Sequence, residues 1–473
     1  MSTLWSGRFD GAPNAAVFDF GSSFRFDRRL FEDDVVGSLA WAEALANAGA
    51  LSAEDARAIQ AALAEILERG RQDPSWVAGT DEDVHSCVER QLVERLGDVG
   101  RRLHTGRSRN EQVSLDLRLF LRRCTRDLQA RLRRLVRAFL TLASRCGEAR
   151  MPAYTHLRRA QPVLIAHFLL AHAAALRRDH GRFQIAITEA DALPLGSGAV
   201  AGTNYPIDTA ALAARLGFSR VVANSIDASA DRDFVSAFLH ACALTMVHLS
   251  RFAEDIVIFS GEEHGFFELS DEASTGSSMM PQKKNPDPLE LVRGKTGRAI
   301  GHLAGWLATM KGLPSGYNKD LQEDKEAVFD AEATVAGSLE AVAIVVEGLS
   351  VNSERAERAA AGLLLATDVA DYLVGKGVPF RRAHELVGAM TRRLLAEGRD
   401  FESLPLPEWR GYSELFEADV IDRVTARASV EARRTPQSTH PGAVQAALRE
   451  MGGWLEGADR PASTALPPTE SLC

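Results

Sequence analysis

Residues 276–287, GSSMMPQKKNPD, combine side chains that could bind and polarise an anion. The segment contains two serines, a lysine pair and an asparagine amide, and lysine and amide groups donate hydrogen bonds to anionic oxygens. Its prolines exclude a continuous helix, while its opening glycine permits a sharp bend. The composition therefore favours a flexible anion-binding loop that closes over its ligand. A plain exposed basic loop is the simpler alternative.

A second polar segment, residues 103–110, reads LHTGRSRN and offers hydroxyl, guanidinium and amide donors. It directly precedes a long stretch with helical periodicity, and the amino terminus of a helix attracts carboxylates. These groups could therefore bind an acidic ligand. The alternative is a helix cap in which Ser108 or Asn110 satisfies free backbone N–H groups.

A third segment, residues 154–162, reads YTHLRRAQP and places His156 between a threonine and basic residues. Histidine side chains titrate near neutral pH and often transfer protons in enzymes, although a hydrogen-bonded structural histidine is equally compatible with this pattern. Residues 194–203, PLGSGAVAGT, are glycine-rich but lack the spacing of a phosphate-binding or dinucleotide-binding loop. We interpret them as a turn.

The elements that must position these segments are long helices. Apolar residues recur every three or four positions across residues 117–142, 239–256 and 328–349, which predicts amphipathic helices. The first stretch lies within the proline-free residues 111–151, and the alternation typical of strands is almost absent. Because apolar helix faces must be buried against one another, we expect an all-α protein with a long-helix bundle.

The composition argues against nucleic-acid-binding, disulfide-rich and membrane-spanning classes of protein. The chain has 473 residues, 45% of them hydrophobic and 25% charged, and its net charge of −9 argues against a nucleic-acid or acidic-membrane surface. Its five scattered cysteines indicate neither a disulfide framework nor a zinc site. We find no export signal, and the longest uncharged apolar stretch, residues 163–176, is too short to span a membrane. We therefore expect a cytoplasmic protein.

The pattern suggests three domains followed by a tail. We predict an amino-terminal helical domain over residues 1–105 and a central bundle domain over 106–360, which contains the 276–287 loop. A carboxy-terminal helical domain is expected over residues 361–458. Residues 459–473 are rich in proline and serine and are expected to be disordered.

These segments together resemble a known family. GSSMMPQKKNPD resembles the signature of the fumarase and aspartase superfamily, and its QKKNPD form is similar to that of argininosuccinate lyases. Further similar segments follow in the family's order: LWSGRF, EDVHSCVERQL, LHTGRSRNEQV, YTHLRRAQP, LPLGSGAVAGTNYPID, NSIDASADRDF and GYNKDLQEDKEAVFDA. The resemblance implies an all-α, three-domain fold whose central helices form the core of a homotetramer, with active sites shared between subunits.

The same resemblance implies reversible elimination of argininosuccinate to L-arginine and fumarate, the last step of arginine biosynthesis, without a metal or organic cofactor. A proton must leave the carbon beside a carboxylate, and a guanidino nitrogen must leave the adjacent carbon. By resemblance, Ser277 is the base, with an alkoxide stabilised by Lys283, and His156 is the acid, paired with Glu290. Which of His156 and Ser277 donates and which accepts stays open.

The resemblance also implies a set of substrate-binding residues: Ser23, Ser108, Arg109, Asn110, Thr155, Asn285, Tyr317, Gln322 and Lys325. Four residues depart from the family pattern, namely Trp41, Val88, Glu111 and Arg158, and none of them removes a proposed catalytic group. Arg158 adds a charge two residues from His156 and so bears on the choice of substrate.

Two other functions remain open. One is a sister lyase that releases fumarate from a different substrate, and the other is an inactive structural homologue of the crystallin type. The GYNKDLQEDKE segment favours argininosuccinate, and the presence of His156, Ser277 and Lys283 favours an active enzyme.

Overall fold

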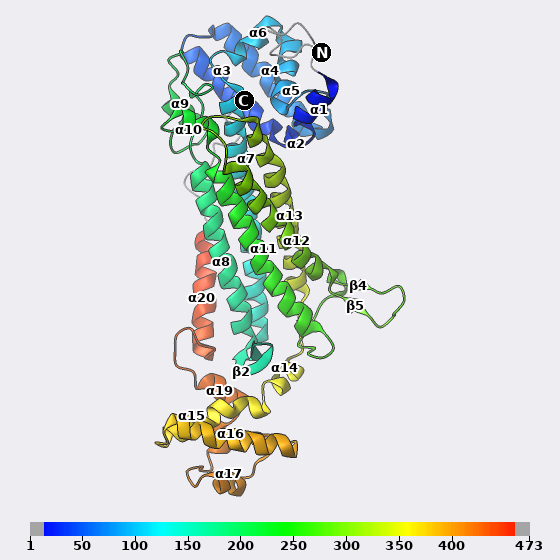
Figure 1. Ribbon diagram of the computed structural model, residues 1–473, viewed down its shortest axis with the longest axis vertical. Coiled ribbons are helices and arrows are strands. Elements are labelled where there is room, and N and C mark those ends of the chain that lie inside the picture. Colours follow the sequence, from blue (N-terminus) through cyan, green and yellow to red (C-terminus); the bar gives the residue numbers. More distant parts are fainter. Residues whose placement is uncertain (1–13, 459–473) are drawn as a thin grey trace.

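The computed structural model describes residues 14–458, and almost every element in them is a helix (Figure 1). The elements lie along one axis, with one group of helices at the amino-terminal end, the longest helices in the middle and a further helical group at the opposite end. The all-α prediction is confirmed. The predicted disordered tail, residues 459–473, lies outside the described residues.

The amino-terminal helices form one end of the molecule. Their bounds are α1 (Ala15–Gly21), α2 (Phe24–Asp27), α3 (Phe31–Asn47), α4 (Ala53–Gln72), α5 (Val84–Leu96) and α6 (Asp98–Arg101). Two short helices from the middle of the chain, α9 (Thr209–Arg215) and α10 (Ser225–Ala230), lie at the same end (Figure 1). Trp41 on α3 is fully buried, and its Nε1 donates a hydrogen bond to the Thr105 carbonyl at 3.2 Å. This bond attaches the 103–110 segment to α3.

Five long helices form the bundle: α7 (Arg109–Cys146), α8 (Ile165–Ala190), α11 (Asp233–Ser260), α12 (Asp287–Met310) and α13 (Glu323–Gly348). The three predicted helical stretches lie in α7, α11 and α13, as expected. With 38 residues, α7 is about 57 Å long at about 1.5 Å per residue. It therefore carries the chain from the amino-terminal helices to the opposite end.

A capping box fixes the start of α7. The Ser108 hydroxyl accepts the N–H of Asn110 at 3.3 Å, and Glu111 accepts the N–H of Ser108 at 3.0 Å. The second oxygen of Glu111 accepts the N–H of Gly198 at 3.0 Å. Gly198 has φ +58, and an added Cβ would lie 2.5 Å from the Gly202 carbonyl oxygen, so the turn at 194–203 requires glycine here.

Helix α11 has a length and composition that would allow it to cross a membrane. In the structure it packs against α8, α12 and α13, and its residues Phe238, Leu239 and Cys242 are fully buried. Core helices of globular proteins commonly have this composition, so the observation by itself does not indicate a membrane span.

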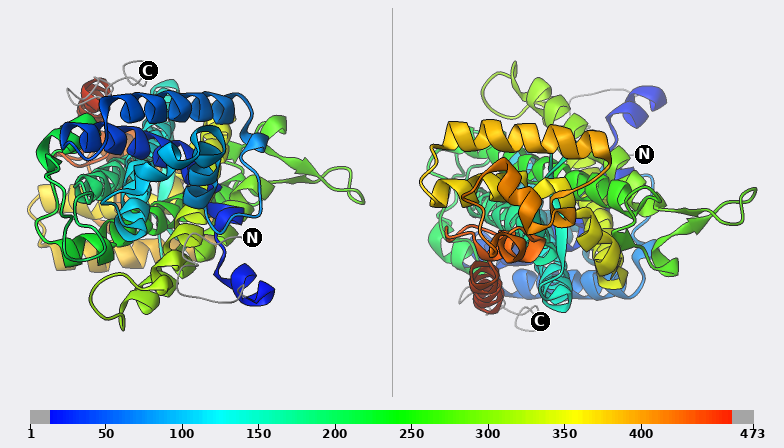
Figure 2. Two further views of the ribbon diagram at one scale, coloured as in Figure 1. Left: turned by 90° about the horizontal axis from the view of Figure 1, so that it is seen from above. Right: turned by 90° about the horizontal axis from the view of Figure 1, so that it is seen from below.

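Two β-hairpins carry segments that the sequence singled out. Strands β1 (Arg150–Thr155) and β2 (Arg158–Leu164) pair antiparallel and were not predicted. Strands β4 (Thr275–Gly276) and β5 (Lys284–Asn285) pair at the base of the 276–287 loop, which projects away from the bundle in both views of Figure 2. A third short pair, β3 (Phe267–Glu268) with β6 (Ser350–Val351), joins the chain after α11 to the chain after α13.

The carboxy-terminal helices are α14 (Ser353–Ala359), α15 (Ala366–Gly375), α16 (Phe380–Glu397), α17 (Leu406–Tyr412), α18 (Val420–Arg423), α19 (Ala426–Glu431) and α20 (Pro441–Ala458). Buried residues between Leu365 and Val424 form a hydrophobic core of their own. In contrast, Val444, Met451 and Leu455 of α20 belong to the main core, because α20 packs along α7 and α8. The domain boundaries at 105 and 360 stay a prediction.

Candidate active site

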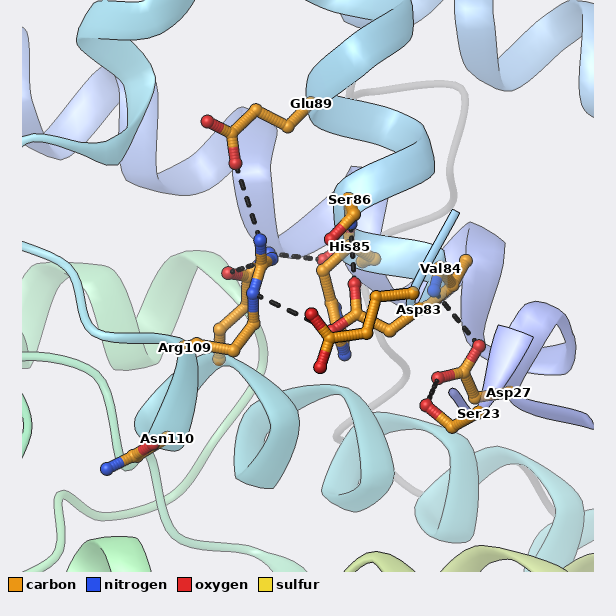
Figure 3. Close-up of polar contacts among 12 residues, drawn as sticks. Ser23, Asp27, Asp83, Val84, His85, Ser86, Glu89, Arg109 and Asn110 are labelled. Carbon is orange, nitrogen blue, oxygen red and sulfur yellow. Dashed lines mark hydrogen bonds and ion pairs between the residues drawn. The ribbon is translucent and has the colours of Figure 1, made fainter. Parts of the chain in front are cut away.

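The first group of predicted site residues lies where α2 meets the segment before α5. The Ser23 hydroxyl is buried and donates to Asp27 Oδ2 at 2.5 Å, and Asp27 Oδ1 accepts the N–H of Val84 at 3.0 Å (Figure 3). Burial raises the pKa of Asp27, against the opposing charge of His85. Ser23 is therefore held in one orientation by a carboxylate.

Arg109 and Asn110 lie beside this group, in the first turn of α7. The Arg109 guanidinium lies 3.4 Å from Glu89 and 3.9 Å from Asp83 and donates to Gln112 at 3.0 Å. Burial opposes ionisation of Asp83, but Arg109 and other partners outweigh it and lower its pKa. Asn110 points away from these side chains in Figure 3, and no hydrogen bond within residues 14–458 occupies its side-chain amide. Its amide is thus available to a ligand.

Tyr317 and Gln322, in the segment before α13 (Glu323–Gly348), and Lys325, in its first turn, approach the same end. Gln322 Nε2 donates to the Gly21 carbonyl at 3.2 Å, two residues before Ser23. The buried Lys325 ammonium lies 2.9 Å from Asp324 Oδ1, whose other oxygen accepts Arg232 Nε at 2.8 Å. Burial and the neighbouring Asp324 raise the pKa of Tyr317 to about 12.

Thr155 and His156 lie at the opposite end of α7, at the tip of the β1–β2 hairpin. Thr155 pairs with Arg158, so His156 and Leu157 form a two-residue turn. Both have positive φ, 54° and 56° respectively, as a type I′ turn requires. Such turns favour Asn and Gly, and each non-glycine residue in this conformation costs roughly 1–2 kcal/mol. The hairpin tolerates this strain while exposing the imidazole to solvent.

The third group lies on the 276–287 loop. The half-buried Ser277 hydroxyl accepts the N–H groups of Met279 at 3.3 Å and Met280 at 3.0 Å. Lys283 is exposed, Asn285 lies on β5, and Glu290 lies in the first turn of α12. Among the described residues of one chain, no hydrogen bond or ion pair links His156 to Glu290.

A buried polar cluster was missed by the sequence analysis. His85 Nδ1 lies 2.9 Å from Asp34 Oδ1 and 3.1 Å from Asp116 Oδ2, and all three side chains are at most 1% exposed. These atoms have spacing that could hold a metal ion. Gln112 Nε2 donates to Asp34 at 2.5 Å, and the charge of the buried Arg107 also acts on both carboxylates. Neither Asp34 nor Asp116 stands in a segment that the sequence analysis singled out, and apolar helical spacing does not identify a polar contact.

Comparison with known proteins identifies the family. The sequence model of the family described as Lyase matches residues 7–301, and that of the argininosuccinate lyase C-terminal region matches residues 363–431. The chain is 47% identical over 458 residues to the argininosuccinate lyase of Moorella thermoacetica, covering 96% of this chain and 98% of that protein. It is 49% identical over 454 residues to the enzyme of Pelotomaculum thermopropionicum, covering 95% and 98%.

The chain belongs to the argininosuccinate lyase family. Among solved structures, it is similar to EDDS lyase in complex with formate, with a TM-score of 0.82 and 27% identity, covering 96% of this chain and 93% of that one. It also shares the fold of the 3-carboxy-cis,cis-muconate lactonizing enzyme from Pseudomonas putida, with a TM-score of 0.73 and 21% identity, covering 93% and 100%. The superfamily resemblance is confirmed.

In this member of the argininosuccinate lyase family, the predicted site residues lie at three separate places along one chain. One chain places seven of them around the start of α7, namely Ser23, Ser108, Arg109, Asn110, Tyr317, Gln322 and Lys325. Thr155 and His156 lie at the far end of α7, and the 276–287 loop projects from the side of the bundle (Figure 1). A single chain therefore brings together seven of the nine proposed binding residues, but not Thr155, Asn285 or the proposed acid and base.

Two departures from the argininosuccinate lyase pattern have structural roles. Glu111 makes the capping box and the contact to Gly198, while Trp41 holds the Thr105 carbonyl. Both therefore support the backbone around Ser108, Arg109 and Asn110. Val88 is simply buried in the amino-terminal core.

Proposed function

We propose that the protein catalyses the reversible elimination of argininosuccinate to L-arginine and fumarate, closing arginine biosynthesis in the cytoplasm. The observation that carries this proposal is the near-full-length match to argininosuccinate lyases, together with the presence of every residue proposed for the chemistry. A solved relative with a TM-score of 0.82 is described as an EDDS lyase variant with bound fumarate, which supports fumarate as a product.

The proposed chemistry assigns the residues to two ends of the substrate. Asn110, Thr155 and Asn285 donate to the succinyl carboxylates, and Tyr317, Gln322 and Lys325 hold the amino-acid end. Deprotonation adds a second negative charge beside a carboxylate, so preorganised donors must stabilise that charge. Lys283 and Asn285 on the loop have the required chemistry.

Ser277 removes the proton and His156 protonates the departing guanidino nitrogen. An unassisted serine is a very poor base, so the loop must bring the Lys283 ammonium and backbone N–H groups to the alkoxide. Closing the loop over the succinyl end would also exclude water and strengthen each of these interactions. The exposed hairpin base at β4–β5 supports such a motion.

We further propose a homotetramer whose active sites combine residues from different subunits. The separation of the binding residues, His156 and Ser277 along one chain supports this assembly. Large apolar side chains on bundle helices are also left exposed in a single chain, including Ile185, Leu291, Ile300, Leu307 and Ile344. Light scattering should give the mass of four chains. An active monomer would contradict the proposal.

The reaction is tested by following fumarate in the ultraviolet. Argininosuccinate should be cleaved, whereas adenylosuccinate and EDDS should be turned over far more slowly. Preferential cleavage of another substrate would identify a sister lyase, and no turnover of any of them would indicate an inactive structural homologue.

The shared site is tested by mixing two inactive variants. His156→Asn and Ser277→Ala tetramers are dissociated together and reassembled, so that some sites receive an intact histidine and an intact serine from different subunits. Activity should return only in the mixture. Reassembly of each variant alone is the matched control, and an inactive mixture would contradict a site divided between subunits.

A further inference from the structure

A pocket of about 700 Å³ lies at the lower end of the bundle, beside the His156 hairpin. It is lined by the β1–β2 hairpin, the segment between α11 and β3, and α14. Four of its side chains are arginines, Arg158, Arg159, Arg355 and Arg358, and only one, Glu263, is a carboxylate. The volume falls in the range of small-molecule sites, roughly 300–1,000 Å³.

This local excess of positive charge is unusual in a chain whose net charge is −9. Like charges gathered in one cavity repel each other, and the repulsion is relieved when an anion binds among them. The four arginines come as one pair from β2, Arg158 and Arg159, and one pair from α14, Arg355 and Arg358, so the meeting of the two pairs is a property of the tertiary structure. A solvated basic helix face would not show this arrangement.

Two of the arginines are already held in place by the backbone. Arg159 donates to the Ala359 carbonyl at 3.1 Å, and Arg355 donates to the Glu262 carbonyl. A guanidinium group has five N–H donors, so one such bond orients the group and leaves donors for a ligand. Within residues 14–458, no hydrogen bond or ion pair engages the Arg158 guanidinium. Arg358 has only a 3.7 Å ion pair with Glu354, both being exposed.

One wall of the pocket is aromatic. The Tyr154 and His264 rings lie 5.9 Å apart edge to face, and His264 lies 5.6 Å from the buried Phe266. A wall of packed rings beside guanidinium donors suits a ligand with a flat apolar part and a multiply charged part. A single small anion would leave most of this volume unused.

We propose that this pocket binds an organic di- or triphosphate, with the phosphates on the arginines and a planar base against the Tyr154 face. The site goes beyond the proposed lyase function and does not rest on it, because none of these arginines is among the proposed catalytic or substrate-binding residues. Leu157, next to His156, lines the same pocket, so an occupant would contact the hairpin that carries the proposed acid.

The proposal is tested by calorimetric titration of the full-length protein with pyrophosphate and with ATP, in metal-free buffer at fixed ionic strength. The unmodified protein should show saturable binding, with ATP binding more tightly than pyrophosphate. The variant R158Q/R358Q should bind both at least tenfold more weakly. The matched control R381Q/R382Q, which removes two exposed arginines from α16, should bind like the unmodified protein.

Two further outcomes locate the site. Lys283→Ala should leave pyrophosphate binding unchanged, whereas loss of binding in this variant would place the anion on the 276–287 loop and overturn the proposal. Equal affinity of R158Q/R358Q and the unmodified protein, or no saturable binding at all, would also overturn it. All of these binding measurements are independent of lyase activity, so their outcome cannot be confused with failure of the proposed reaction.

Discussion

His85 Nδ1 lies 2.9 Å from Asp34 Oδ1, and both side chains are inaccessible to water. Burial disfavours a charged imidazole, but hydrogen bonds to Asp116 and Asp34 outweigh it and raise the pKa of His85 to about 10. The folded protein therefore holds this proton more tightly than the unfolded chain, in which the pKa is about 6.5. The resulting stabilisation is complete below about pH 6.5 and is lost as the pH rises through about 10.

We accordingly expect the thermal unfolding temperature to fall between about pH 7 and pH 10, and His85→Gln to flatten that part of the profile. The neutral variant should also be less stable than the unmodified protein near pH 6. Calorimetry across this pH range measures both effects. Parallel profiles for the two proteins would show that His85 is not protonated in the folded state.

Glu111→Ala should destabilise the protein by roughly 1–3 kcal/mol, because the N–H groups of Ser108 and Gly198 would lose their acceptor. The matched control is Glu65→Ala, which removes an exposed carboxylate from α4 and should change stability little. Urea unfolding of both variants measures the difference. Similar midpoints for Glu111→Ala and Glu65→Ala would contradict the structural role of the capping box.

Leu157→Gly should raise the free energy of unfolding by about 1 kcal/mol, since glycine adopts positive φ without strain and this leucine is 77% exposed. Leu157→Ala keeps a Cβ and should not give this gain. A stabilising effect of alanine equal to that of glycine would point to the loss of exposed apolar surface instead.

Ser277→Ala should fold and assemble normally, bind argininosuccinate with near-native affinity, and lose turnover by at least the ~10²-fold typical of a missing proton-transfer group. Lys283→Ala should impair binding as well as turnover. Single-turnover kinetics with calorimetric binding separates the two. Near-native turnover by Ser277→Ala would leave the loop a role in closure only.

Treatment with EDTA should leave lyase activity intact. The cluster of Asp34, His85 and Asp116 has metal-ligand spacing, but His85 and Gln112 already contact Asp34, and the charge of Arg107 acts on both carboxylates. Activity before and after chelation, with Mn²⁺ or Co²⁺ added back, checks this. Loss on chelation followed by recovery with a metal would reassign the cluster as a metal site.

The long helices could be predicted because their apolar spacing is a local property of the sequence, as in the stretch from Leu117 to Leu142 within α7. The β1–β2 hairpin could not. Its facing residues Pro152 and Pro162 lack N–H donors, and the strands are rich in arginine, so they carry no strand signal.

The candidate site also has a part that the sequence could predict and a part that it could not. Family resemblance supplied the residues on the polar segments, and their roles stay predictions. His85 stands in a segment that carried the resemblance, yet nothing in its neighbours along the chain reveals Asp34 or Asp116. The contact forms only when α3, α5 and α7 pack together, and no local sequence pattern predicts which of their residues come into contact.

The return of α20 to the bundle bears on how the chain matures during synthesis. Arg177 on α8 pairs with Glu450 on α20 at 2.8 Å across 273 residues of sequence, and Val444, Met451 and Leu455 cover the main core. A chain still emerging from a ribosome therefore exposes apolar parts of α7 and α8 until α20 has been released. Premature termination before residue 441 would leave the bundle uncovered and prone to aggregation, although every proposed catalytic residue had already been made.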